Sequence, residues 1–349
     1  MALSGAGKPL LVWGAGAIGG TIGAHLLRAG HDVLFVDVVE AHVDAINAAG
    51  LTITGPLAEF TVPARAVTPD RVEGTHPAVW LCTKAQHTAE ATRQILPHLS
   101  DDGHILSLQN GLTERIVAEI AGRERTLGAF INFGADYLEP GRILHGGRGA
   151  VVVGELDGAA TERLAATRAL LAAFEPDAVA TDNIWGYLWG KLGYGALLFA
   201  TALTDDSIAD VLASRPDRPA LAALAAEMMA VARAEGVTPL GFNGYEPAAF
   251  MPGADPAATQ ASFDAMVAHN AKSAKSHSGI WRDLAVRKRK TEVDPLITEP
   301  VAIGAGHGHP MPLTRLLVSL IEDIEGGRRP LSRETLAVLT AAHTEGAAA

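Results

Sequence analysis

The sequence feature that most constrains the fold is a short apolar run near the amino terminus that breaks into three spaced glycines. Leu10–Trp13 is followed by Gly14, Gly16 and Gly19, and a helical pattern continues over Thr21–Ala29. Gly14 permits a sharp turn, Gly16 has no side chain to keep the backbone from a pyrophosphate, and Gly19 lets the helix pack closely on the strand. The pattern predicts a dinucleotide-binding turn with the helix N-terminus facing the phosphates. The expected cofactor-binding residues of this turn are Gly14, Gly16, Ala17, Ile18 and Gly19.

A carboxylate after the next apolar run strengthens this interpretation. Glycine is common in this chain, with 37 of 349 residues, so the glycines alone are weak evidence. His31–Asp37 is typical of a second strand, and Asp37 closes it at the spacing at which a carboxylate accepts hydrogen bonds from the adenosine ribose. The alternative is that Asp37 is a surface turn residue or a helix cap. Because a carboxylate repels a 2′-phosphate and no Arg or Lys occurs between Gly30 and Gly50, the sequence favours NAD over NADP.

The amino-acid composition limits the classes of protein to which this chain can belong. A chain of 349 residues with 48% hydrophobic content can bury a large core and is expected to form two domains. The net charge of −11 argues against a nucleic-acid partner, which needs a basic face. Cys82 is the single cysteine, and the 13 histidines follow no metal-ligand spacing, so we expect neither an intrachain disulfide nor a metal site. We find no signal-like segment and no long apolar run, so a cytoplasmic protein without membrane contact is expected.

Polar side chains follow two further apolar runs. Ala78–Cys82 and His104–Leu108 are continuous apolar segments typical of buried parallel strands, and they lead to Lys84 and Asn110. Taken singly, each side chain has an ordinary interpretation, as a solvated loop lysine and as part of an Asn-Gly turn. Because ligands bind at the carboxyl ends of parallel strands, the two together predict contacts with a cofactor or a substrate.

The second half of the chain changes to long helices, which predicts a dinucleotide-binding domain over residues 1–183 and a helical domain over residues 184–349. Lys191 lies inside the strongly apolar segment Ile184–Leu203. A lysine in such a place either extends to the surface or serves a site. Partial desolvation lowers the pKa of a lysine, which suits a proton donor to a developing alkoxide.

Smaller elements complete the prediction. Weak alternation around Gly55 predicts a hairpin over Leu51–Ala66, and the basic run Arg287–Lys290 is interpreted as a solvated helix face. Glu345–Ala349 is expected to be a frayed tail. Further strands are predicted at Thr126–Phe133, Ile143–His145, Ala150–Val153 and Ala178–Thr181, and further helices at Glu40–Ala49, Glu162–Phe174, Pro219–Ala234, Thr259–Ser273, Pro300–Gly306 and Leu313–Ile324.

Taken in order, the motifs resemble those of the ketopantoate reductase family across nearly the whole chain. They are GAGAIGG at 14–20, TKAQHT at 83–88, LQNGL at 108–112, WGKL at 189–192, and SGIWRDL with RKRKTEVD at 278–294. The resemblance implies an amino-terminal Rossmann domain with a doubly wound α/β sheet. It also implies an all-helical carboxyl-terminal domain of the 6-phosphogluconate-dehydrogenase-like type, with an active site in the cleft between the two domains.

The resemblance assigns roles to particular positions. Lys191 matches the family's catalytic lysine, which protonates the carbonyl oxygen as hydride arrives from nicotinamide. Glu292 matches the glutamate that holds the substrate and the hydrogen-bond network of the lysine. Asn110 matches the asparagine between nicotinamide and substrate, and Lys84 matches the lysine after the fourth strand. Ser278 corresponds to a serine that binds the substrate carboxylate, although one extra residue separates it from the following aspartate.

Two departures from the family pattern affect the expected cofactor and substrate. The family typically uses NADPH with a basic residue after the second strand, whereas Asp37 favours NAD here. The asparagines one and two helical turns after the catalytic lysine are replaced by Gly195 and Phe199. Losing polar partners weakens binding of a small hydroxylated substrate, so we expect a larger or more apolar substrate with an anionic group. The candidate contacts to that group are Lys275, His277 and Arg282.

Three hypotheses follow. The first is an NAD(H)-dependent oxidoreductase that acts on a 2-oxo or 2-hydroxy acid, or a related secondary alcohol, with Lys191 as general acid/base. The second is a ketopantoate reductase proper that uses NADPH. The third is a non-catalytic NAD-binding sensor, which the presence of both Lys191 and Glu292 argues against. His277 has competing interpretations as a substrate contact, a catalytic base and a helix cap. Apolar helix faces in the second domain lead us to expect a homodimer.

Overall fold

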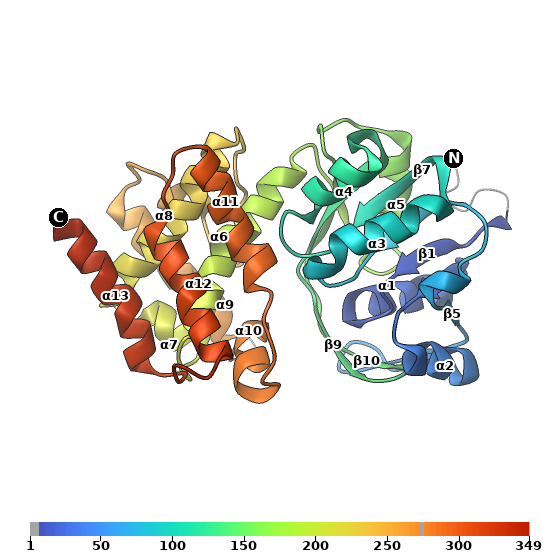
Figure 1. Cartoon of the computed structure of the whole chain (residues 1–349), viewed down its shortest axis with the longest axis horizontal. Coiled ribbons are helices and arrows are strands. Elements are labelled where there is room, and N and C mark those ends of the chain that lie inside the picture. The colour runs from blue at the N-terminus through green and yellow to red at the C-terminus, as the bar shows by residue number, and fades with distance from the viewer. Residues whose placement is uncertain (1–6, 273–275, 349) are drawn as a thin grey trace. The chain divides into compact units, whose positions relative to one another are not determined.

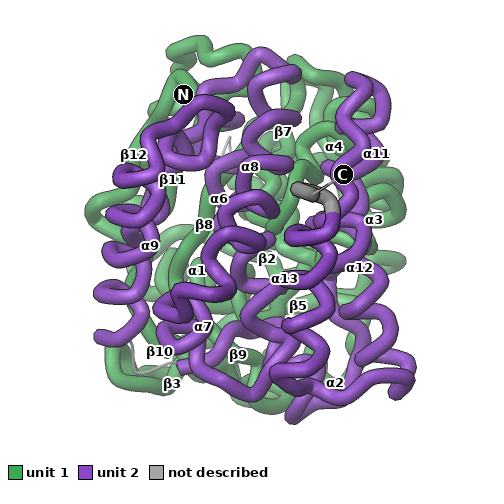
Figure 2. Tube along the Cα trace, turned by 90° about the vertical axis from the view of Figure 1, so that its left-hand side faces the viewer, with its two compact units in different colours: residues 1–184 green, residues 185–349 purple. Residues whose placement is uncertain are grey.

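The computed structural model describes residues 7–272 and 276–348, the side chains of 346–348 excepted. The chain divides into two compact units, Met1–Ile184 (unit 1) and Trp185–Ala349 (unit 2), which are coloured separately in Figure 2. In the described part of the chain, no helix is long and apolar enough to cross a membrane. Each unit is described by itself below.

Within the described residues, unit 1 is built on an eight-stranded sheet. Neighbouring strands run parallel except β8 and β11, which are antiparallel. The predicted parallel sheet is therefore confirmed. In spatial order the strands are β12 (Val179–Ala180), β11 (Val151–Glu155), β8 (Thr126–Ile131), β7 (Leu99–Ser107), β6 (His76–Leu81), β1 (Leu10–Trp13), β2 (Val33–Val36) and β5 (Arg65–Val67).

Helices cover both faces of this sheet. Successive side chains of a strand point to opposite faces, so neighbouring residues of β1 pack against different helices. Val12 packs in a core with Ile22 of α1 (Ala17–Arg28), whereas its neighbour Leu11 packs in a second core with Val117 of α4 (Thr113–Ala121). The first core also includes side chains of α2 (Glu40–Ala49) and α5 (Glu162–Leu171), and the second those of α3 (Thr88–Ile95). Figure 1 shows α3 and α4 beside each other over the sheet.

A smaller, four-stranded sheet belongs to unit 1 in the described part of the chain, with the order β4-β3-β10-β9. The hairpin predicted around Gly55 is confirmed, because β3 (Leu51–Thr54) pairs antiparallel with β4 (Phe60–Val62). β9 (Gly134–Glu139) was not predicted, since its side chains are half-buried or exposed and leave no apolar pattern. It pairs with β10 (Arg142–Gly147), which itself runs parallel to β3. Segments about 90 residues apart in sequence thus share one sheet.

Unit 2 is helical in its described residues, as the sequence predicts. Its longer helices are α6 (Ile184–Thr201), α7 (Ile208–Ala213), α8 (Arg218–Ala234), α9 (Pro256–Ala271), α11 (Glu299–Gly306), α12 (Pro312–Glu325) and α13 (Arg333–Ala348), and its shorter ones are η6 (Pro247–Phe250), α10 (Gly279–Trp281) and the π-helical turns η7 (Arg282–Val286) and η8 (Asp294–Thr298). The expected frayed tail is wrong, because α13 continues through it to Ala348.

Glycines on α6 allow a loop to pack against the helix backbone. A Cβ at Gly190 would lie 1.9 Å from the carbonyl oxygen of Leu240, and one at Gly193 would lie 2.2 Å from the Tyr245 hydroxyl. The Leu240 amide donates a 2.9 Å hydrogen bond to the Gly186 carbonyl. This close approach fixes the rotation of the part of α6 that carries the candidate catalytic lysine.

Candidate active site

The glycine turn in unit 1 has the geometry that its sequence predicts. Gly14 adopts φ +102°, a conformation that favours glycine. A Cβ at Gly19 would lie 2.1 Å from the Gly14 carbonyl oxygen, so only glycine lets α1 pack this closely on the turn. At Gly16 no atom lies within 4 Å of the Cβ position, so this side of the turn is open to a phosphate group.

The first turn of α1 presents backbone amides next to this open space. The helix begins at Ala17, four residues earlier than the sequence prediction, with Gly16 as its N-cap. Ala17 and Ile18 therefore lie in the first turn, where backbone amides have no helix carbonyl to bond. Together with the positive end of the helix dipole, such amides suit an anionic group.

Asp37 follows β2 and is held by two backbone amides. Its Oδ2 accepts a 2.8 Å hydrogen bond from the amide of Ala15 in the glycine turn, and its Oδ1 accepts a 3.0 Å bond from the amide of Val39. Each carboxylate oxygen has a second lone pair for a ribose hydroxyl. Val38 is 74% exposed, so an uncharged side chain stands next to the carboxylate at the surface. The turn-residue interpretation of Asp37 and a ribose-binding role are thus compatible.

Gln109 joins the two strand ends that carry Lys84 and Asn110, and sequence reasoning missed it. Its side-chain amide donates to the Thr83 carbonyl at 2.9 Å, and its Oε1 accepts from the Thr88 hydroxyl at 3.2 Å. Because β6 and β7 are paired neighbours, both exposed side chains stand at one edge of the sheet. The sequence signal that could have identified Gln109 is its position: it is a polar residue directly after a buried strand, in the same motif as Asn110.

Lys191 is half-buried in the middle of α6. One turn further along the helix, Gly195 has no atom within 4 Å of its Cβ position, which leaves open space on that side of α6. Phe199, two turns after the lysine, is 1% exposed and packs inside unit 2. The two positions therefore differ: the first leaves room beside the helix, and the second fills the interior.

The backbone around Glu292 is fixed by its neighbours. The Thr291 amide and hydroxyl each donate a 2.7 Å hydrogen bond to Oε1 of Glu325 on α12. The Glu292 carbonyl accepts a 3.1 Å bond from the Leu296 amide in η8. π-Helical turns often occur at functional sites, and η8 begins two residues after this half-buried glutamate.

Ser278 and His277 make structural contacts within unit 2. The Ser278 hydroxyl caps α10 by accepting a 3.1 Å hydrogen bond from the Trp281 amide. Nε2 of His277 lies 2.9 Å from the Asp205 carbonyl, and its ring packs on that of Trp281 with centroids 4.1 Å apart. The indole of Trp281 donates a 3.0 Å bond to Oδ1 of Asp205. These contacts hold the segment before α10 against the loop between α6 and α7.

The four residues of the basic run after η7 are exposed, as predicted, but they do not form the predicted helix. Oδ1 of Asp283 accepts 3.0 Å hydrogen bonds from both Arg287 and Arg289, and Lys288 adopts φ +48°, which interrupts the helix. Attraction of two guanidinium groups to one buried carboxylate folds the segment back. Arg282 is half-buried at the start of η7, whereas Lys275 lies outside the described residues.

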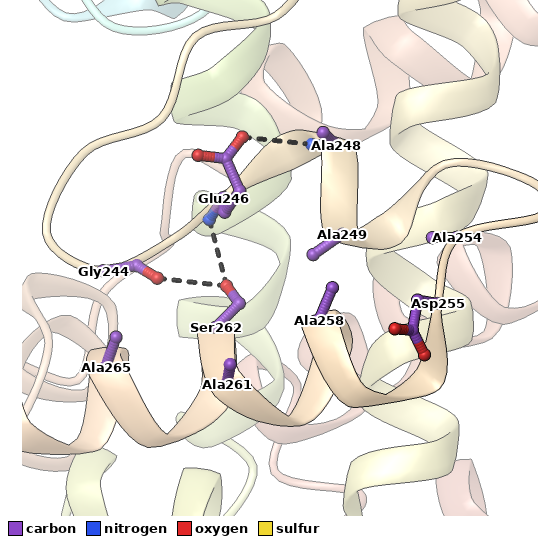
Figure 3. A pocket seen from close by; sticks show the side chains of 10 residues that line it. All are labelled: Gly244, Glu246, Ala248, Ala249, Ala254, Asp255, Ala258, Ala261, Ser262 and Ala265. Atoms are coloured by element: carbon purple, nitrogen blue, oxygen red, sulfur yellow. Dashed lines mark hydrogen bonds between the residues drawn. The ribbon is translucent and has the colours of Figure 1, made fainter.

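A shallow pocket between η6 and α9 carries none of the predicted site residues (Figure 3). Its lining is mostly alanine and glycine, and its polar groups serve the local fold. The Ser262 hydroxyl accepts from the Glu246 amide at 3.0 Å and donates to the Gly244 carbonyl at 3.0 Å. Glu246 and Asp255 cap the helices that follow them. We therefore do not assign the chemistry to this pocket.

Two models of one family match most of the chain. The model described as ketopantoate reductase PanE/ApbA matches residues 10–158, and its C-terminal counterpart matches residues 183–325. The chain belongs to the ketopantoate reductase family. The sequence resemblance is thus confirmed, and this family member is an oxidoreductase acting on CH–OH groups.

Individual members of the ketopantoate reductase family are distant from this chain. It is 29% identical over 252 residues to a 2-dehydropantoate 2-reductase of Mesorhizobium japonicum, which covers 65% of this chain and 75% of that protein. It is 26% identical over 310 residues to one from Streptococcus pyogenes serotype M3, covering 88% and 95%.

Solved structures share the fold over nearly the whole chain. A PanE/ApbA family ketopantoate reductase from Ralstonia eutropha JMP134 superimposes with a TM-score of 0.76 at 27% identity, covering 92% of this chain and 99% of that one. A D-mandelate dehydrogenase in complex with NADH and anilino(oxo)acetate gives a TM-score of 0.77 at 21% identity, with the same coverage. At that identity the second likeness concerns the fold alone.

Proposed function

We propose that this chain is an NAD(H)-dependent oxidoreductase that transfers a hydride between nicotinamide and a 2-oxo/2-hydroxy acid or a related secondary alcohol. The observation that carries the cofactor choice is the Asp37 carboxylate, which the Ala15 amide holds against the glycine turn at 2.8 Å. A negative charge fixed there favours ribose hydroxyls over a 2′-phosphate. The open position at Gly16 and the first-turn amides of α1 fit the pyrophosphate of such a cofactor.

The nicotinamide supplies or accepts the hydride when it is bound. The side chains then have to orient the substrate carbonyl and move one proton. In the reducing direction, the Lys191 ammonium donates a proton to the substrate oxygen, and in the oxidising direction its amine removes the hydroxyl proton. General acid–base help of this kind contributes about 10²–10⁴-fold in rate.

Further residues would position the substrate and the lysine. We propose that Glu292 holds the substrate and the hydrogen-bond network of Lys191, and that Asn110 orients the substrate beside the nicotinamide. Lys84 is proposed to contact the cofactor from the same sheet edge as Asn110. The fixed backbone around Glu292 supports a positioning role, because a carboxylate on a mobile segment would lose orientation.

We propose a substrate with an anionic group and a substituent larger or more apolar than that of ketopantoate. The open space at Gly195, one turn from Lys191, supports this size preference. Ser278 is a weaker candidate for binding the anionic group than the sequence suggested, because its hydroxyl oxygen already caps α10. His277 is weaker still, since the Ser276 hydroxyl lies 2.9 Å from its Nδ1 and the Asp205 carbonyl lies 2.9 Å from its Nε2. Lys275 keeps its predicted role without structural support.

A homodimer in the cytoplasm stays a prediction. Its premise, exposed apolar helix faces, is wrong for the described residues of unit 2, where Val286 is the sole exposed large apolar side chain. Light scattering of the purified protein would give the oligomeric state directly.

The deciding experiment measures hydride transfer with NAD⁺, NADP⁺, NADH and NADPH against hydroxy and oxo acids, including pantoate, ketopantoate, mandelate and phenylglyoxylate. Lys191→Ala is the inactive variant, and Lys8→Ala, which removes an exposed lysine of unit 1, is its control. We expect NAD-linked turnover of a bulky acid that Lys191→Ala abolishes and Lys8→Ala retains. Efficient ketopantoate reduction with NADPH would refute both the cofactor and the substrate proposals. Tight NADH binding without turnover of any acid would favour the sensor.

A further inference from the structure

A buried histidine on α2 bridges the glycine turn and the turn between β9 and β10. His42 is 1% exposed, and its Nε2 lies 2.9 Å from the Ala15 carbonyl oxygen. Its Nδ1 accepts a 2.9 Å hydrogen bond from the Gly141 amide. Because Nδ1 accepts, the ring hydrogen is on Nε2, which therefore donates to Ala15. The imidazole makes both contacts as one neutral tautomer.

The contact fixes the peptide group between Ala15 and Gly16, next to the proposed phosphate site. Ala15 is held on both sides, since its amide donates to Asp37 and its carbonyl accepts from His42. The peptide bond is planar and trans, so the Ala15 carbonyl and the Gly16 amide point in opposite directions from one rigid plane. Holding the carbonyl toward His42 therefore directs the Gly16 amide away from it. At the Cβ position of Gly16 no atom lies within 4 Å, so the turn is open beside the residue that carries this amide.

The other side of His42 is anchored to the smaller sheet. Gly141, at φ +74°, forms the turn that joins β9 to β10, and its carbonyl accepts a 2.9 Å bond from Thr52 on β3. The ring of Tyr137 on β9 packs edge-on against the His42 ring, with centroids 5.1 Å apart. A rotation of the imidazole would break the Gly141 contact, so the small sheet keeps the Nε2 hydrogen pointed at the glycine turn.

We infer that His42 is a positioning residue for the dinucleotide: through Ala15 it sets the orientation of the Gly16 amide that binds the pyrophosphate. The smaller sheet is then part of the cofactor-binding machinery, although it supplies no atom of the glycine turn. This inference rests on the proposed cofactor function. It concerns how the turn is held, and it is independent of which acid the enzyme reduces or oxidises.

Two substitutions separate the two hydrogen bonds of the imidazole. The amide of Gln reaches about as far as Nε2, so His42→Gln can keep the donor to Ala15 while it loses the acceptor for Gly141. The amide of Asn reaches about as far as Nδ1, so His42→Asn can keep the Gly141 contact while it loses the one to Ala15. Each variant loses one buried hydrogen bond, so the two are matched in their effect on the fold.

Binding of NADH is measured by fluorescence titration, together with KM and kcat for the nicotinamide cofactor and the melting temperature of each variant. We expect His42→Asn to bind NADH about 3- to 10-fold more weakly, the change that one hydrogen bond produces, with a matching rise in KM and little change in kcat. His42→Gln is expected to bind within about twofold of the wild type. Adenosine, which has no pyrophosphate, is expected to bind all three proteins alike.

The outcomes separate this inference from the proposed function. If the wild type binds no nicotinamide dinucleotide, the proposed function is refuted, and the inference with it. If the wild type binds NADH and the two variants bind it equally well, or lose affinity in proportion to their loss of melting temperature, His42 is a structural residue and the inference alone is refuted. Loss confined to His42→Asn at equal melting temperature supports it.

Discussion

Replacing Gly190 with alanine would place a methyl group where the backbone of another segment lies. The new Cβ would be 1.9 Å from the Leu240 carbonyl oxygen, well inside van der Waals contact. A backbone atom cannot rotate away as a flexible side chain can, so the loop has to move from α6. That movement would also stretch the hydrogen bond from the Leu240 amide to the Gly186 carbonyl.

The expected cost follows from three terms. Overpacking costs about 1–3 kcal/mol, and the weakened hydrogen bond costs about 0.5–1.5 kcal/mol. The higher helix propensity of alanine returns about 1 kcal/mol. Gly190→Ala should therefore lower the stability of unit 2 by about 0.5–3.5 kcal/mol, or roughly 1–14 °C in Tm for a unit of this size.

Gly195→Ala is the matched control on the same helix. No atom lies within 4 Å of its Cβ position, so the substitution keeps the propensity gain without a clash. It should raise Tm by roughly 1–4 °C. Thermal unfolding followed by circular dichroism compares the two variants. Equal stabilisation by both would refute the argument that the loop packing requires glycine at position 190.

Three further predictions concern the site and its surroundings. Asp37→Asn keeps an oxygen to accept from the Ala15 amide but removes the negative charge. The preference for NADH over NADPH in kcat/KM should therefore fall about tenfold, with Tm nearly unchanged. An unaltered preference would contradict the role of the carboxylate. Burial, and then the nearby Arg163, lower the pKa of His104 to about 4, so the unfolded chain takes up a proton below pH 6.5 that the folded chain does not. Stability should fall as the pH drops from 6.5 to 4, by about 3 kcal/mol from this group, and urea midpoints of His104→Leu should depend less on pH over that window. Gln109→Leu leaves the groups around Thr83 unpaired, and we expect a loss of about 1–3 kcal/mol and a higher KM for the cofactor, measured by denaturation and by steady-state kinetics.

Local patterns in the sequence were sufficient to place the candidate site residues on their elements. The three glycines, the carboxylate at position 37 and the side chains at 84 and 110 are each tied to a strand end, and a strand end can be recognised from a few consecutive residues. The lysine at position 191 stands out in the same way, as a charge within an apolar helix. Motif order along the chain then indicated the family, which the family models confirm.

Other features depend on residues far apart in the chain, and no local pattern encodes them. The strand β9 carries no apolar alternation and exists because β10 pairs with it. The basic run after η7 is not helical as predicted, because Arg287 and Arg289 both donate hydrogen bonds to the buried carboxylate of Asp283.

The sequence by itself determined which residues form the glycine turn, because spacing and residue type decide where a chain can bend and where a phosphate can approach. Only the tertiary structure decided how that turn is held. His42 looks like an ordinary helix residue until the turn at Gly141, 99 positions away, is brought against it. A hydrogen bond depends on distance and direction in space, and sequence separation fixes neither once the chain has folded back on itself.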